Sequence, residues 1–132
     1  MTNISRWALL AAAAAVVVLL AAPGHAAVNT AVAPPSAASV GFATTTVVLI
    51  QGDTLTFANL DTTGHTLTAE LKRSIRKGKK VYKVPVFDSG FVQTGTATVK
   101  GTNTLKPGSY KFYCQPHGLM KGTLVVQAQT AR

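Results

Sequence analysis

From residue 40 onward the chain is a succession of short Thr- and Val-rich segments interrupted by Gly, Asp and Pro. Segments of this length and composition are typical of β-strands, and no window in this part of the chain has a helical period. We predict strands over residues 41–50, 54–59, 65–71, 81–87, 96–100, 109–114 and 122–128. Short strands at this spacing predict an all-β fold, an antiparallel β-sandwich in one domain over residues 40–128.

The first 26 residues have the pattern of a secretory signal peptide. Arg6 supplies a positive charge, residues 7–22 form an apolar run, and small residues before and at Ala26 suit a cleavage site. The run is shorter than the roughly 20 residues of a membrane-spanning helix, and an uncleaved anchor is the alternative. Residues 27–39 are rich in Ala, Pro and Ser, which predicts a flexible leader. We therefore expect export to the periplasm or another extracytoplasmic space.

The chain has a single cysteine, Cys114, and so cannot form an internal disulfide. In an exported protein an exposed free thiol is open to oxidation, so we expect Cys114 to have a specific function. Intermolecular pairing, a free thiol and a metal ligand are the alternatives.

Cys114 opens the seven-residue motif C-x2-H-x2-M, which also contains His117 and Met120. Ligands of one metal lie roughly 3–4 Å apart because the bonds are about 2.0–2.3 Å long. Three extended residues span about 10 Å, so a loop that binds one ion must curl back on itself. Pro116 and Gly118 favour such a turn.

His65 is the candidate for a fourth ligand. Strand alternation places His65 on the same face as Leu67 and Ala69, and Cys114 on the same face as Phe112, so both candidates should point inward. After the first 26 residues the chain has two histidines, one cysteine and one methionine, and all four belong to this set. Separate packing roles in the core are the alternative interpretation.

The donor atoms of this set favour copper. Two imidazoles and a thiolate would suit either zinc or copper, but a thioether is not among the usual ligands of zinc. Two histidines and a cysteine with a weak axial methionine describe a type 1 copper site, which transfers electrons. The predicted metal ligands are His65, Cys114, His117 and Met120.

The segment from Lys106 to His117, continued by residues 120–122, resembles the copper loop of cupredoxins. Residues 57–59 and 87–90 are similar to the same family. The two residues between the histidine and the methionine of the loop resemble amicyanin, whereas plastocyanin and pseudoazurin have a longer gap.

The resemblance spans roughly residues 40–127 and implies an eight-strand Greek-key β-sandwich with one copper that alternates between Cu(II) and Cu(I). It also implies that His117 lies near the surface in an apolar patch. Cupredoxins of this kind often have Asn directly after the first histidine ligand, where its side chain joins the two ligand loops. This chain has Thr66, whose hydroxyl can donate and accept and can take that role. Pro116 has no N–H to donate to the Cys114 sulfur.

The chain is basic, with 13 Lys and Arg against 4 Asp and Glu and a formal net charge of +9. Seven of these cations lie in residues 72–83, where Lys77-Gly78-Lys79 predicts the turn of a hairpin. A solvated surface is one interpretation, and steering of a redox partner with an acidic docking surface is the other. No aromatic ladder for nucleic acid interleaves the lysines, whereas peripheral binding to anionic lipid remains an alternative.

We predict a monomeric carrier that shuttles single electrons between redox protein partners, and not an enzyme. An extracytoplasmic copper-delivery protein is the alternative, although such a protein would usually expose additional Met or His. A second, catalytic copper would need further histidines, and nothing in the loop indicates the oxyanion site of a hydrolase.

Overall fold

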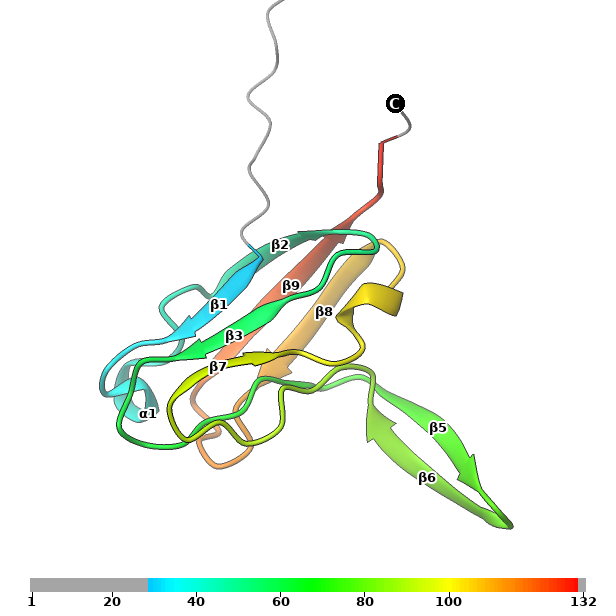
Figure 1. The fold of residues 1–132 in the computed structure, drawn as a ribbon, viewed down its shortest axis with the longest axis horizontal. Helices are drawn as coiled ribbons and strands as arrows, with labels where there is room; N and C mark the ends of the chain where they lie inside the picture. Colours follow the sequence, from blue (N-terminus) through cyan, green and yellow to red (C-terminus); the bar gives the residue numbers. More distant parts are fainter. Residues whose placement is uncertain (1–28, 131–132) are drawn as a thin grey trace, which may run out of the picture.

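Nine strands form nearly all the regular structure of residues 29–130, the part of the chain that the computed structural model describes (Figure 1). The strands are β1 (Thr30–Ala33), β2 (Thr46–Ile50), β3 (Thr56–Asn59), β4 (Thr68–Ala69), β5 (Lys72–Lys77), β6 (Lys80–Pro85), β7 (Gly95–Thr98), β8 (Gly108–Tyr113) and β9 (Lys121–Gln127). Two short helical turns, α1 (Ala37–Val40) and the 3-10 turn η1 (Thr102–Thr104), were not expected. The predicted all-β sandwich is confirmed.

The sandwich consists of two facing sheets. One has the strand order β1-β3-β7 and the other β2-β9-β8-β4. Between them, the ring of Phe42 meets the rings of Phe57 and Phe112 edge-on, at centroid distances of 6.1 and 5.1 Å. Such edge-to-face contacts are favourable for aromatic rings. Phe57 comes from one sheet and Phe112 from the other, so this cluster joins the two layers.

Two strand pairs are parallel, whereas the sequence predicted an antiparallel sandwich. β1 lies parallel to β3, and β2 lies parallel to β9. Parallel neighbours need a long crossover connection between them. In both pairs here, the intervening chain contributes a strand to the other sheet before it returns. The prediction was wrong on this point because side chains alternate with a period of two in both kinds of pair.

Residues 30–40 belong to the sandwich, although a flexible leader was predicted over residues 27–39. β1 pairs with β3 along its whole length, and Ala31, Ala33 and Ala37 are fully buried. An Ala- and Pro-rich composition resembles a linker, but alanine also fits where a strand packs closely against its neighbours. The predicted signal peptide, residues 1–26, lies outside the described residues. Within residues 29–130 no helix is long and apolar enough to cross a membrane.

The predicted basic hairpin is confirmed, and it is longer than expected. β5 and β6 form an antiparallel sheet of their own, with Lys77 opposite Lys80 at the turn. The charged residues thus form the strands themselves, whereas the sequence predicted a strand up to residue 71 and only a charged connection after it. The regular part of that earlier strand is only β4.

Candidate metal centre

The loop between β8 and β9 curls back on itself, as a common metal site requires. The N–H of Cys114 donates to the carbonyl of Met120 at 3.0 Å, and the N–H of Met120 donates to the carbonyl of His117 at 2.9 Å. A third bond, 3.3 Å long, runs from the N–H of His117 to the carbonyl of Cys114. The first and last residues of the motif therefore lie side by side.

His65 approaches the same place from the segment between β3 and β4. Its backbone exchanges two hydrogen bonds with Val92, of 3.0 and 2.9 Å. The ring of Phe91 lies against Gly64, where a Cβ atom would overlap it. Glycine before the histidine therefore permits this close approach.

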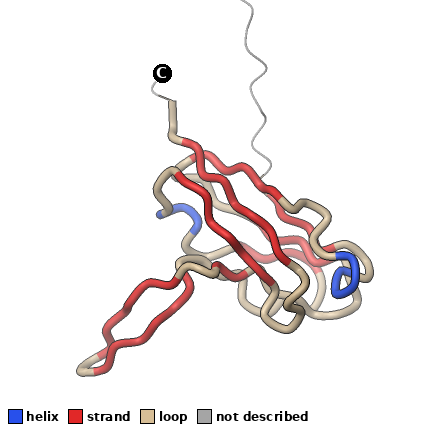
Figure 2. The backbone as a smooth tube through the Cα atoms, turned by 180° about the vertical axis from the view of Figure 1, so that it is seen from behind, coloured by secondary structure: helices blue, strands red, loops and turns tan. Residues whose placement is uncertain are grey.

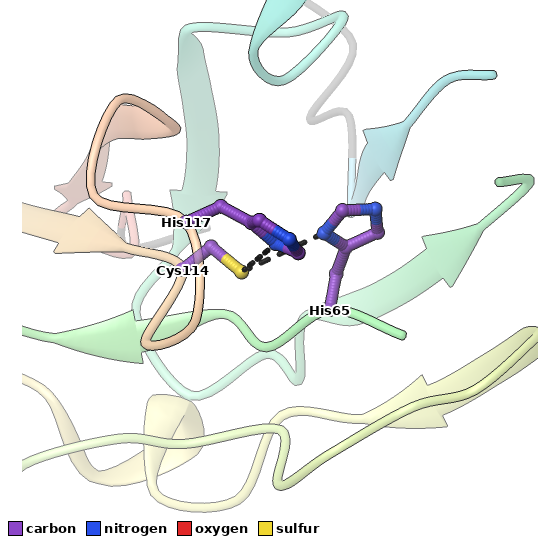
Figure 3. A group of neighbouring side chains, drawn as sticks. All are labelled: His65, Cys114 and His117. Atoms are coloured by element: carbon purple, nitrogen blue, oxygen red, sulfur yellow. Dashed lines mark hydrogen bonds between the residues drawn. The ribbon is translucent and has the colours of Figure 1, made fainter. Parts of the chain in front are cut away.

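The side chains of His65, Cys114 and His117 converge from these two segments (Figure 3). The Sγ of Cys114 lies 3.6 Å from the Nδ1 of His65 and 3.6 Å from the Nδ1 of His117. One candidate ligand atom from each of the three residues lies within 4.8 Å of the others. Ligands of one metal are roughly 3–4 Å apart, so these separations suit a single ion.

The burial of the four predicted ligands is asymmetric. His65, Cys114 and Met120 are fully buried, whereas His117 is partly exposed. The inward orientation that strand alternation predicted for His65 and Cys114 is confirmed. Beside the site, Leu119 is 85% exposed. The centre therefore lies at the rim of the core, with one imidazole reaching the surface beside an apolar side chain.

Thr66 joins the two ligand segments, as the sequence led us to expect. Its Oγ1 accepts a hydrogen bond from the N–H of Gln115 at 2.9 Å and another from the hydroxyl of Thr68 at 3.0 Å. The N–H of Thr66 points at the Sγ of Cys114, at 3.4 Å. The cysteine sulfur therefore accepts a hydrogen bond from the segment that carries His65. Pro116, in the loop of Cys114 itself, has no N–H to donate.

Asp61 completes the surroundings of His65, and sequence reasoning did not identify it. One carboxylate oxygen, Oδ2, lies 2.9 Å from the Nε2 of His65, and both side chains are buried. An N–H at Nε2 that donates to this carboxylate leaves Nδ1 free to face Cys114. Carboxylate partners of this kind fix the tautomer and the orientation of metal-binding histidines.

The same carboxylate is anchored to the N-terminal segment. The N–H groups of Ser36 and Ala37 each donate to Asp61 at 3.2 Å, and the N–H of Thr62 donates at 2.8 Å. The hydrogen bond to His65 is the largest cause that lowers the pKa of Asp61, from 3.8 to about 2. Burial raises this pKa, and the three backbone N–H groups lower it further.

The sequence signal available for the contact between Asp61 and His65 was their spacing of four residues. On a helix that spacing would place the two side chains on one face. In an irregular loop it carries no such information, and residues 61–65 form no helix. The contact depends on how Asn59 shapes the loop, since its amide donates to the carbonyls of Thr63 and Val92.

The donor atoms assembled here fit copper. The site offers two imidazole nitrogens and a cysteine sulfur, and the fully buried Met120 closes the same loop. Zinc does not usually take a thioether, whereas two histidines, one cysteine and a weak axial methionine form a type 1 copper site.

Comparison with known proteins agrees with this chemistry. The sequence profile of copper binding proteins of the plastocyanin/azurin family matches residues 27–127. Comparison with curated protein sequences gives no significant match.

Two solved structures have a similar fold. A purple cupredoxin from Nitrosopumilus maritimus is 23% identical, with a TM-score of 0.55 over 74% of this chain and 98% of that chain. An oxidised methionine-to-leucine mutant of amicyanin is 18% identical, with a TM-score of 0.50 over 74% of this chain and 80% of that chain. At these identities the structures show the fold, and the profile match shows the family. The chain therefore belongs to the plastocyanin/azurin family of copper binding proteins, the cupredoxins.

Proposed function

We propose that this protein is an exported type 1 copper protein that carries single electrons between redox partners. The proposed ligands are His65, Cys114, His117 and Met120. The observation that carries the proposal is the convergence of one thiol and two imidazoles, with the sulfur 3.6 Å from both Nδ1 atoms. A family of copper binding proteins matches the whole segment that builds this centre.

The chain positions these side chains through hydrogen bonds of its own. Asp61 and Val92 hold His65, the backbone bond between Cys114 and Met120 closes the loop, and Thr66 joins the two segments. Bound copper supplies a reversible one-electron change between Cu(II) and Cu(I). Because the folded chain sets the positions of the ligands, little rearrangement accompanies that change, which favours fast electron transfer.

His117 is the proposed route for electrons to and from the surface. The other three proposed ligands are fully buried, and His117 alone of the four has exposed surface. Leu119 extends into solvent beside it and offers an apolar contact for a partner. A redox protein seated on this loop would approach the imidazole edge directly.

An electron carrier agrees with the chain better than an enzyme. Both histidines beyond the first 26 residues belong to the centre already described. A second, catalytic copper would find no further imidazole in residues 27–132. The small number of His and Met residues also argues against a copper-delivery role. Such a role would need additional His or Met for transient copper binding, and residues 27–132 contain none beyond the proposed ligands.

Export is part of the proposal and is supported by the sequence of residues 1–26. Cell fractionation of the full chain should place it in the extracytoplasmic fraction. Mass spectrometry should find a mature chain that begins at Ala27. Recovery of the intact chain in the membrane fraction would contradict cleavage and would support an anchor.

Copper titration followed by absorption spectroscopy tests the function. We expect one copper per chain and an intense thiolate-to-copper band toward the red end of the visible spectrum, bleached by ascorbate and restored by oxidation. Cys114→Ala should lose this band, whereas Met120→Leu, which removes only the weak axial ligand, should keep it. A Cys114→Ala protein that still shows the band would refute the site, and a band that cannot be bleached reversibly would refute the carrier.

A further inference from the structure

The β5–β6 hairpin is an arm that stands clear of the sandwich (Figures 1 and 2). Within residues 29–130 its strands pair only with each other, and none of their residues is buried. At its base the N–H of Val86 donates to the carbonyl of Leu71 at 2.9 Å, which closes the arm where it leaves the sandwich. A lone two-stranded hairpin is at best marginally stable in water, so this arm adds little to the stability of the core.

The arm carries the net charge of the described chain. Residues 72–85 contain seven cations and no acidic residue, and all seven cations are exposed. The rest of residues 29–130 contains four lysines and four acidic residues, so its formal charge is zero. The seven are Lys72, Arg73, Arg76, Lys77, Lys79, Lys80 and Lys83.

One face of the arm combines these cations with apolar side chains. Residues that lie opposite each other in an antiparallel pair share a face. Ile75 lies opposite Tyr82, and Arg73 lies opposite Val84. Tyr82 is 45% exposed, although no core requires an aromatic side chain there. Exposed aromatic and arginine side chains are enriched where proteins bind other proteins.

The base of the arm and the ligand loop line the same surface hollow. Lys72 of β5 and Gly118, the neighbour of His117, both border it. The other residues of its lining are Glu70, Tyr113 and Lys121. A protein seated on the ligand loop would therefore also meet the base of the arm.

We propose that the arm binds an acidic surface of the redox protein that exchanges electrons through His117. This inference rests on the proposed function and names the partner's chemistry. Charge complementarity selects an acidic occupant, because the arm presents seven positive charges and no negative one. The shared hollow selects a protein over a lipid surface, because the electron acceptor or donor must itself sit at the ligand loop. Attraction of this kind raises the rate of encounter about 10–1,000-fold at low ionic strength.

Electron transfer to an acidic protein tests the proposal. In anaerobic stopped-flow experiments, a reduced acidic plant-type ferredoxin loses one electron as the Cu(II) protein becomes Cu(I) and the visible band disappears. The arm variant carries Lys79→Glu and Lys80→Glu. The control carries Lys106→Glu and Lys111→Glu, which change the net charge equally but lie at exposed positions on the sandwich. The small cation hexaammineruthenium(II) serves as a reductant that has no acidic surface.

At low salt we expect the arm variant to react with ferredoxin at least about 10-fold more slowly than the unmodified protein, and the control to react within about twofold of it. The difference should disappear as added salt shortens the screening length below about 8–10 Å. Equal slowing of both variants would show that only net charge matters and would overturn the proposal.

Three further outcomes separate this proposal from the alternatives. If the arm variant reacts normally with ferredoxin but no longer binds phosphatidylglycerol vesicles, with phosphatidylcholine vesicles as the reference, the arm is a membrane element and the proposal is wrong. If neither ferredoxin nor hexaammineruthenium(II) bleaches the unmodified copper protein, the electron-carrier function itself fails. If the ruthenium complex bleaches the copper protein normally but the arm variant and the unmodified protein react with ferredoxin at the same rate, only the docking proposal is overturned.

Discussion

His65 is held at both its ring and its backbone by the folded chain. Its backbone pairs with Val92, and its Nε2 faces the carboxylate of Asp61. The carboxylate in turn accepts from the backbone of Ser36 and Ala37, which belong to the N-terminal segment. The orientation of one proposed copper ligand thus depends on a part of the chain nearly thirty residues away.

Asp61→Asn should weaken copper binding about 10–100-fold, because partners of metal-binding histidines have effects of this size. It should also change the acid stability of the metal-free protein. The pKa of Asp61 is about 2 in the folded chain against 3.8 for an ordinary Asp, so the ionised form stabilises the fold above about pH 4. That contribution disappears as the pH falls toward 2. Denaturant unfolding at several pH values should therefore show a smaller acid-induced loss for Asp61→Asn.

The matched control for this experiment is Asp53→Asn, since Asp53 is an exposed carboxylate in the turn after β2. It should behave like the unmodified protein in both copper affinity and acid unfolding. An Asp61→Asn protein with the same acid dependence as this control would contradict the role assigned to the carboxylate.

Thr66→Val should destabilise the metal-free protein, because valine has nearly the same shape but no acceptor for the N–H of Gln115. An unsatisfied, partly buried N–H costs about 1–3 kcal/mol. Thr66→Ser keeps the hydroxyl and should retain more of the stability than Thr66→Val. Chemical unfolding of the three proteins gives the comparison. A valine variant as stable as the serine variant would show that the hydroxyl does not join the two ligand segments.

At the scale of elements, the N-terminal strand is the part whose composition was most misleading. β1 forms one edge of its sheet, and its alternate side chains are buried alanines. A small side chain adds little apolar area, so an alanine-rich strand lacks the Val- and Ile-rich signature of other strands. Its stability comes from the backbone pairing with β3 and from the bonds to Asp61.

A chain that begins at Gly41 should be much less stable than one that begins at Asn29. The deletion removes the β1–β3 pairing and two hydrogen bonds to Asp61. At about 0.5–1.5 kcal/mol for each bond, the loss should be at least about 3 kcal/mol. Thermal unfolding of the two metal-free chains measures this difference. Equal melting temperatures would restore the interpretation of this segment as a leader.

At the scale of the whole molecule, the net positive charge and the metal centre lie in different parts of the fold. The sandwich holds the metal centre and has no formal net charge over the described residues, whereas the arm holds seven cations. Such a charge distribution orients a molecule as it approaches a charged surface, before any contact is made. Association with a partner should therefore depend on salt, while the absorption spectrum should not.

The sequence alone determined the fold class and the residues of the candidate site. The alternation of side chains in short segments between turn residues predicted the strands that became β2, β3, β8 and β9, because the side-chain period of a strand is a local property. The four proposed ligands could be named because His, Cys and Met are rare in this chain and three of them lie in one loop. Alternation also placed His65 and Cys114 inward.

Only the tertiary structure decided which distant segments meet. The parallel partners of β1 and β2 and the contact between Asp61 and His65 join parts of the chain for which local periodicity carries no information. The same holds for the hollow shared by Lys72 and Gly118. Local sequence sets the face on which a side chain lies, whereas the packing of the two sheets sets what that side chain contacts.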